Sequence, residues 1–153
     1  MKILVDADAC PVKDEVYRVA RRHGLPVLVV ANSAMRVPLV DSIVLEVVSG
    51  RFDAADDRIV ERSGAGDIVV SNDIPLAARC LAKGAWVLSP KGRRFTQESI
   101  GDDLATRDLL AQLRDGGAVT GGPPPFDAKD RSRFLDQLES TIRAARRSSA
   151  AGA

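Results

Sequence analysis

Short apolar runs of strand length alternate with segments of helical periodicity along the first 90 residues, and this alternation is what most restricts the fold. The clearest run, Val27-Leu28-Val29-Val30, is continuous, which is typical of a parallel strand covered on both faces. Helical segments lie between most of the runs, which predicts a three-layer α/β/α fold with a mostly parallel sheet. The five predicted strands cover residues 2–5, 27–30, 43–47, 68–70 and 85–88.

The last third of the chain differs in character. An apolar stripe over residues 99–114 predicts a helix, after which glycines and prolines form a break that neither a helix nor a strand crosses. We therefore expect an α/β domain over residues 1–115 and a Gly/Pro linker over 116–127. An amphipathic C-terminal helix over 128–147 should pack on the domain, and residues 148–153 are expected to be a disordered tail.

Composition excludes several classes of protein. Aromatic residues make up only 4% of the 153 residues, which argues against a module that stacks bases on aromatic side chains. The single histidine, His23, argues against zinc sites of the His/Cys type and against a Ser-His-Asp triad. Two cysteines make no disulfide framework, and no apolar stretch is long enough to cross a membrane, so we expect a cytoplasmic protein without a membrane partner.

Aspartates follow two of the predicted strands. Asp6 and Asp8 come after the first strand and Asp73 after the fourth, at the edge where open α/β sheets bind ligands. Asp56 and Asp57 lie in the first turn of a helix that begins after Asp53, and Asp56 shares the buried stripe of that helix. Helix capping is the alternative role for each. Because converging carboxylates repel one another and hard oxygen ligands suit Mg²⁺ or Mn²⁺, all five are candidate catalytic residues of a metal-dependent enzyme acting on phosphates.

Basic and polar residues near the same edge are candidate substrate ligands. A basic cluster follows the fifth strand, a lysine follows the acidic loop, and two polar residues precede Asp73. For the basic cluster, phosphate binding and ordinary solvation are equally consistent with the sequence. The candidates for substrate binding are Lys13, Ser71, Asn72, Lys91, Arg93 and Arg94.

Several long motifs resemble one bacterial family. The segments are VDADACPVK at 5–13, FD at 52–53 with AD at 55–56, GDIVVSNDIPLA at 66–77, AKGA at 82–85, SPKGR at 89–93 and GPPPF at 122–126. Together they span nearly the whole chain and are similar to the YaiI/YqxD-like family. That family is grouped with the PIN-like superfamily, whose members resemble metal-dependent nucleases.

The resemblance implies a PIN-like sheet and metal-dependent hydrolysis of RNA phosphodiesters. The acidic positions of the PIN pattern fall on Asp6, Asp56 and Asp73, which would hold Mg²⁺ or Mn²⁺. Asp8 or Asp57 would complete the metal shell or orient the attacking water.

Two other interpretations remain open. In one, the protein is a non-catalytic scaffold that binds RNA or a protein, and its final helix docks on a partner or on a second copy of the chain. In the other, it is a phosphatase of the haloacid-dehalogenase kind with Asp6 as the nucleophile, although Lys91 follows Asp73 here and that chain order disfavours it.

Overall fold

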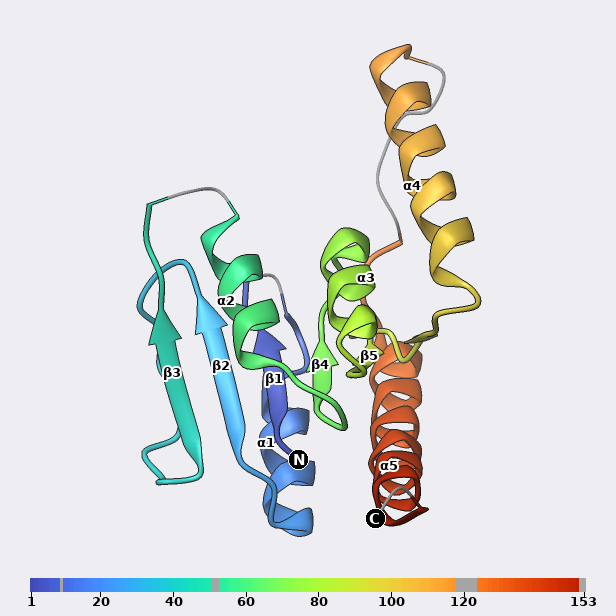
Figure 1. Ribbon diagram of the computed structural model, residues 1–153. Helices are drawn as coiled ribbons and strands as arrows, with labels where there is room; N and C mark the ends of the chain where they lie inside the picture. The colour runs from blue at the N-terminus through green and yellow to red at the C-terminus, as the bar shows by residue number, and fades with distance from the viewer. Residues whose placement is uncertain (9, 51–52, 118–123, 152–153) are drawn as a thin grey trace.

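The computed structural model describes residues 1–8, 10–50, 53–117 and 124–151. Strands and helices alternate in the predicted order through the first five strands (Figure 1). The strands are β1 (Ile3–Asp6), β2 (Val27–Ala31), β3 (Ile43–Val47), β4 (Ile68–Val70), β5 (Trp86–Leu88) and β6 (Arg94–Phe95). The helices are α1 (Lys13–His23), α2 (Ala54–Arg62), α3 (Ile74–Ala82), α4 (Ile100–Asp115) and α5 (Ala128–Ala151).

The strands form one sheet in the order β3-β2-β1-β4-β5-β6, in which only β6 runs antiparallel to its neighbour. β1 lies at the centre, with Val5 opposite both Val29 of β2 and Val70 of β4. This register brings the carboxyl ends of β1, β2 and β4 to the same edge of the sheet. Residues that follow these strands therefore meet above one crevice.

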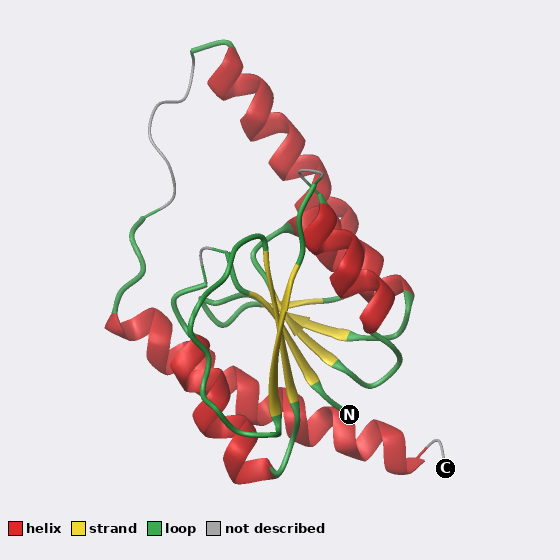
Figure 2. Ribbon diagram, turned by 90° about the vertical axis from the view of Figure 1, so that its left-hand side faces the viewer, coloured by secondary structure: helices red, strands yellow, loops and turns green. Residues whose placement is uncertain are grey.

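Helices cover both faces of the sheet, and Figure 2 shows the sheet edge-on between the two helical layers. On one face, Ile3, Val5 and Val29 pack with residues of α1 and α5, including Phe134 and Leu138. On the opposite face the third apolar residue of β1, Leu4, packs with residues of α2 and α3. The central strands β1, β2 and β4 are mainly apolar on both faces because both faces are covered, as the continuous run of β2 predicts.

The three-layer α/β fold predicted from the sequence is confirmed, with one strand more than expected. β6 covers only Arg94 and Phe95, too short a run to give a periodic signal, and it pairs with β5 after a turn at Gly92. Helix α5 continues to Ala151, through most of the segment expected to be a disordered tail. Half of the expected Gly/Pro linker, residues 118–123, lies outside the described residues.

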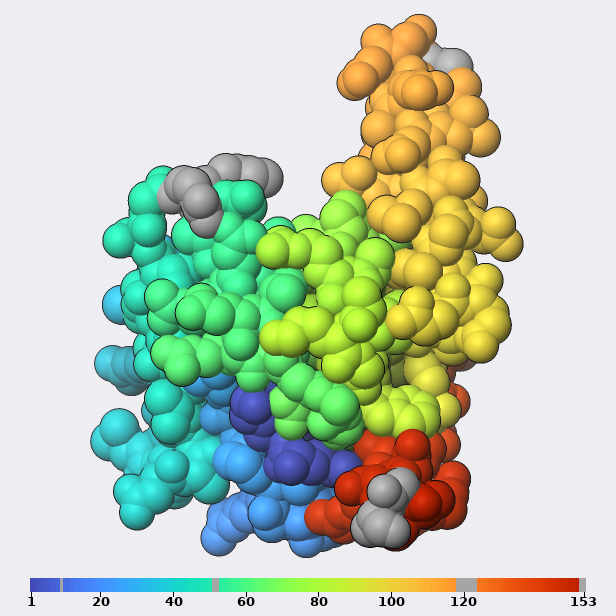
Figure 3. Space-filling model, in the orientation of Figure 1, coloured from blue at the N-terminus to red at the C-terminus, as the bar shows by residue number. Residues whose placement is uncertain are grey.

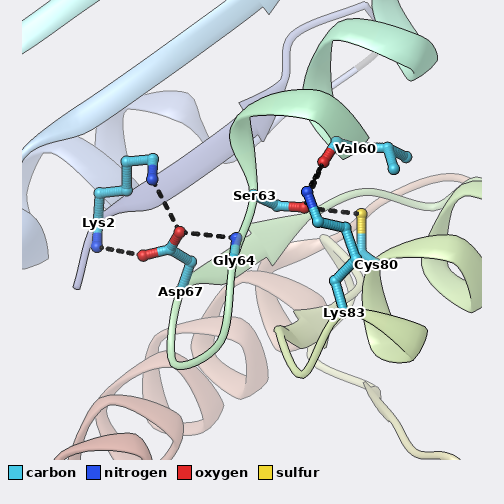
Figure 4. Close-up of polar contacts among 7 residues, drawn as sticks. All are labelled: Lys2, Val60, Ser63, Gly64, Asp67, Cys80 and Lys83. Atoms are coloured by element: carbon cyan, nitrogen blue, oxygen red, sulfur yellow. Dashed lines mark hydrogen bonds and ion pairs between the residues drawn. The ribbon is translucent and has the colours of Figure 1, made fainter.

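Contacts at the amino end of β4 join this strand to β1 and to helix α2 (Figure 4). The Asp67 carboxylate accepts hydrogen bonds from the backbone N–H of Lys2 at 3.0 Å, from the Lys2 ammonium at 2.8 Å and from the Gly64 N–H at 3.0 Å. The Ser63 hydroxyl donates to the Val60 carbonyl, which also accepts from the Lys83 ammonium. Asp67 therefore has a structural role at the edge opposite the crevice.

Helix α5 packs against α1 and passes directly over the turn between β5 and β6. At Gly92 (φ 88°) an added Cβ would come within 2.8 Å of the backbone at Arg133 and Phe134. The amino-terminal turn of α4 packs against α3, whereas the rest of α4 projects from the body (Figure 3). In the part of the chain that the structure describes, none of the helices is long and apolar enough to cross a membrane.

Candidate functional site

Asp6 and Asp73 are joined through one buried hydroxyl. The Ser71 hydroxyl, which follows β4, donates a hydrogen bond of 2.8 Å to Oδ2 of Asp6 at the end of β1. The same oxygen of Ser71 accepts the backbone N–H of Asp73 at 3.0 Å. The Asp73 carboxylate in turn accepts the N–H of Leu76 at 3.0 Å, so it caps α3. The parallel pairing of β1 and β4 places these groups together.

An open cavity of about 450 Å³ lies at this edge of the sheet. Four aspartates line it, from three different parts of the chain: Asp6, Asp8, Asp56 and Asp73. The remaining lining residues follow β2 and β3 or begin α2: Asn32, Val48, Ser49, Gly50 and Ala55. Four of the five predicted catalytic aspartates therefore face one cavity.

Asp8 is held by a residue that the sequence did not single out. Its Oδ2 accepts hydrogen bonds from the Asn32 backbone N–H at 3.1 Å and from the Asn32 side-chain amide at 2.9 Å. Neither Asp6 nor Asp8 caps α1, because Val12 occupies the N-cap position without a side-chain hydrogen bond. The capping alternative considered for these two aspartates is therefore excluded by the geometry.

Asp56 carries the clearest electrostatic signal in the cavity. Partial burial, followed by the negative charges of Asp73 and Asp6 and a hydrogen bond with Asp73, raises the pKa of Asp56 to about 6. The positive charge of Arg79 acts in the opposite direction. Helix geometry explains why Asp56 turns inward: it precedes the fully buried Ile59 by three residues. A carboxylate placed there is costly unless it finds a cation.

The pKa of Asp6 is also raised. Burial is the main cause, and the charges of Asp73 and Asp8 add to it, whereas the hydrogen bond from Ser71 acts in the opposite direction. The charge of Asp73 therefore raises the pKa of both Asp6 and Asp56, and the charge of Asp6 adds to the effect on Asp56.

Asp57 lies outside this group, on the far side of α2. Its Oδ1 accepts a hydrogen bond of 2.9 Å from Arg79 of α3, and it lines a neighbouring hollow with Arg58 and Glu61. Arg79 is a cation whose charge reaches Asp56, and sequence reasoning missed it. The signal available was its spacing, six residues beyond Asp73 on the helix that Asp73 caps.

The predicted basic ligands point elsewhere. The Lys91 ammonium donates to the Pro124 carbonyl at 2.7 Å, Arg93 pairs with the buried Asp103 of α4, and Arg94 bonds Thr141 of α5 at 3.2 Å. Lys13 donates to the Cys10 carbonyl at 2.8 Å within its own loop. Asn72 is exposed. Among the predicted substrate ligands, and within the part of the chain that the structure describes, only Ser71 is found hydrogen-bonded to aspartates that line the cavity.

The donor chemistry of the cavity fits a hydrated divalent ion. Among the residues that the structure describes, no group of three or more His, Cys, Asp or Glu side chains is arranged to hold a metal ion. Mg²⁺ does not require such a group, because it retains several waters and is commonly bound through one or two carboxylates together with substrate phosphate. The coupled carboxylates of Asp6, Asp56 and Asp73 supply hard oxygen donors whose mutual repulsion a cation would relieve.

Comparison with known proteins places the chain in a family. The model of the family described as "Uncharacterized BCR, YaiI/YqxD family" matches residues 4–144. The chain belongs to this family. The match includes every residue that lines the acidic cavity.

Close relatives in the YaiI/YqxD family cover almost the whole chain. A UPF0178 protein of Rhodopseudomonas palustris strain BisB18 is 56% identical over 147 residues, which are 96% of this chain and 95% of the relative. One of Paramagnetospirillum magneticum is 56% identical over 146 residues, 95% of this chain and 97% of the relative. One of Brucella ovis is 58% identical over 141 residues, 92% of this chain and 88% of the relative. The chain matches no solved structure.

Proposed function

We propose that this protein is a Mg²⁺- or Mn²⁺-dependent hydrolase of RNA phosphodiester bonds, with its centre at the acidic cavity. One observation carries the proposal: Asp6, Asp56 and Asp73, from separate elements, converge near the carboxyl ends of parallel strands, and the pKa values of Asp6 and Asp56 are raised there. RNA is chosen as the substrate because these positions resemble the acidic positions of PIN-like nucleases.

In this proposal the three carboxylates of Asp6, Asp56 and Asp73 hold the ion, directly or through water. A bound Mg²⁺ or Mn²⁺ supplies positive charge for the scissile phosphate and makes a coordinated water more acidic. Ser71 keeps the Asp6 carboxylate oriented, and the N–H of Leu76 fixes that of Asp73. These hydrogen bonds limit the rotation of both side chains, so the donor set is arranged before the ion and substrate bind.

Two neighbouring side chains have supporting roles. Asn32 holds Asp8 at the rim of the cavity, where the free carboxylate oxygen can accept a hydrogen bond from water or from a substrate hydroxyl. Arg79, held by Asp57, offers a guanidinium to a phosphate that approaches Asp56.

The test is cleavage of labelled single-stranded RNA, with single-stranded DNA in parallel, in Mn²⁺, Mg²⁺ or EDTA. Asp73→Asn is the informative variant, since asparagine caps a helix as well as aspartate does and removes only the charge. Asp136→Asn, an exposed change on α5, is the matched control. Cleavage that needs the metal, survives in the control and disappears in Asp73→Asn supports the proposal. A wild-type rate in Asp73→Asn would overturn it.

A binding role without catalysis is the second candidate, and α4 favours it. This helix projects from the body, with Leu109 55% and Leu110 37% exposed (Figure 3). Two adjacent exposed leucines on a projecting helix offer an apolar surface to a second macromolecule. Tight binding of RNA or of a protein without turnover in either metal would favour this candidate.

A further inference from the structure

A second cavity, of about 380 Å³, lies at the opposite edge of the sheet from the aspartates. It is formed between the second half of α1 and the segment that leads into β3. Leu25, just before β2, and Ser42 and Ile43, at the start of β3, place it at the amino ends of the strands. In Figure 1 this is the end opposite the arrowheads. It is therefore a separate site, and its role does not depend on the proposed nuclease.

The walls of this cavity are mainly apolar, and one of them is aromatic. The half-buried side chain of Tyr17 forms one wall, and Leu25, Pro38, Val40 and Ile43 form the others. Tyr17 packs against the core formed by α1, α5 and the sheet, so the orientation of its ring is fixed. Such a cavity lies within the size range of small-molecule sites.

Two arginines line the same cavity and have no ion-pair partner among the described residues. Arg18 and Arg21 are three residues apart on α1 and are both exposed. No ion pair or side-chain hydrogen bond to either is found among the described residues, whereas the next arginine, Arg22, pairs with Glu139. Two guanidinium groups one helical turn apart attract an anion, and each can donate two hydrogen bonds to a phosphate.

We propose that this cavity binds a nucleotide, with the base against Tyr17 and the phosphate held by Arg18 and Arg21. A planar, weakly polar ring joined to a phosphate matches an aromatic and apolar wall beside two unpaired guanidinium groups. Neither part of the site accounts for the other: an apolar cavity needs no arginine pair, and an anion alone needs no aromatic wall. The nucleotide is either a free mononucleotide or the 5′-phosphorylated end of an RNA chain, and both carry the same chemistry.

Isothermal titration of the full chain with AMP and UMP tests the proposal, with adenosine and inorganic phosphate as partial ligands. We expect AMP to bind at least about tenfold more tightly than either partial ligand, because each of them fills half of the site. Arg18→Gln/Arg21→Gln should weaken AMP binding by about tenfold or more. Tyr17→Leu should weaken binding, whereas Tyr17→Phe, which keeps the ring, should bind like wild type.

The matched control is Arg107→Gln, which removes another exposed arginine, from α4. It should leave binding unchanged. Competition between AMP and short RNAs with and without a 5′-phosphate shows whether the ligand is a free mononucleotide or an RNA end. If the phosphorylated RNA displaces AMP and the unphosphorylated RNA does not, the site is assigned to RNA ends. No binding of AMP or UMP at millimolar concentration would overturn the proposal. So would wild-type affinity in the double arginine variant when circular dichroism shows that it is folded.

Discussion

The Ser71 hydroxyl lies 2.8 Å from Oδ2 of Asp6 and is almost completely buried, so the two residues at the ends of β4 and β1 share one shielded hydrogen bond. The same hydroxyl oxygen accepts the Asp73 N–H. A single side chain therefore orients one aspartate of the acidic group and fixes the backbone of another. Its removal should affect both stability and ion binding.

We predict that Ser71→Ala lowers the free energy of unfolding by about 1 kcal/mol, because it removes two hydrogen bonds to partly buried groups, the Asp6 carboxylate and the Asp73 N–H. It should also weaken Mn²⁺ binding, since Asp6 loses its orientation. Urea unfolding and titration of Mn²⁺ by electron paramagnetic resonance measure the two effects. Asn72→Ala, at the exposed neighbouring position, should change neither. A Ser71→Ala protein with wild-type stability would show that the shared hydrogen bond contributes little.

The raised pKa of Asp56 predicts how stability depends on pH in the absence of divalent metal. Its pKa is about 6 in the folded protein, against an ordinary value of 3.8 for an aspartate. As pH rises, the unfolded chain therefore loses this proton at a lower pH than the folded protein does. The charged carboxylate consequently destabilises the fold at pH above 6. That cost disappears as pH falls below 4. Asp56→Asn should raise the free energy of unfolding at pH 7.5 by about 1 kcal/mol, once solvent screening is allowed for, and should have little effect near pH 4.

Urea unfolding of the two proteins in EDTA at several pH values measures this difference. The variant must be compared with wild type at each pH, since Asp6 titrates in the same direction. Added Mg²⁺ should stabilise wild type more than Asp56→Asn at pH 7.5. A difference between the two proteins that does not change with pH would contradict the prediction.

The positions of Asp6 and Asp73 followed from the sequence because topology alone decides them. Each lies at or just after the end of a buried strand. The right-handed crossover connections of a parallel sheet place the ends of β1 and β4 side by side. The roles of Asp56 and Asp57 could be distinguished from the sequence, because their helical spacing relative to Ile59 determines which side chain faces the core. In these cases a local pattern determines both the element and the face.

The directions of Lys91, Arg93 and Arg94 could not be predicted in the same way. The chain reverses at Gly92 into β6, and a two-residue strand is too short to show the periodicity from which a strand is predicted. Their partners, Pro124, Asp103 and Thr141, are distant in sequence. The contributions of Asn32 and Arg79 likewise depend on contacts across the fold, with Asp8 and Asp57, which no local pattern encodes.

Arg93 provides a test of whether this basic cluster is structural. Its guanidinium pairs with Asp103, which is 8% exposed at the base of α4. We predict that Arg93→Gln lowers the free energy of unfolding by about 1–3 kcal/mol, because a buried carboxylate loses its charged partner. RNA affinity, measured by fluorescence anisotropy, should remain at the wild-type value. Asp108→Asn, which breaks the exposed pair with Arg107, should cost less than about 0.5 kcal/mol. Lost RNA affinity in a stable Arg93→Gln protein would assign the cluster to substrate binding instead.

Gly92 should be the most sensitive point in the packing of α5. An alanine there must adopt a positive φ, and its Cβ must also displace the helix backbone at Arg133 and Phe134, 2.8 Å away. Gly24→Ala is the matched control, because Gly24 has φ 66° and nothing within 4 Å of an added Cβ, so it incurs the backbone strain alone. We expect Gly24→Ala to cost about 1 kcal/mol and Gly92→Ala about 3 kcal/mol or more, since overpacking adds to the strain. Thermal and urea unfolding measure both variants. Equal destabilisation of the two would show that α5 moves away from the turn without cost, and would contradict the close packing between α5 and the β5–β6 turn.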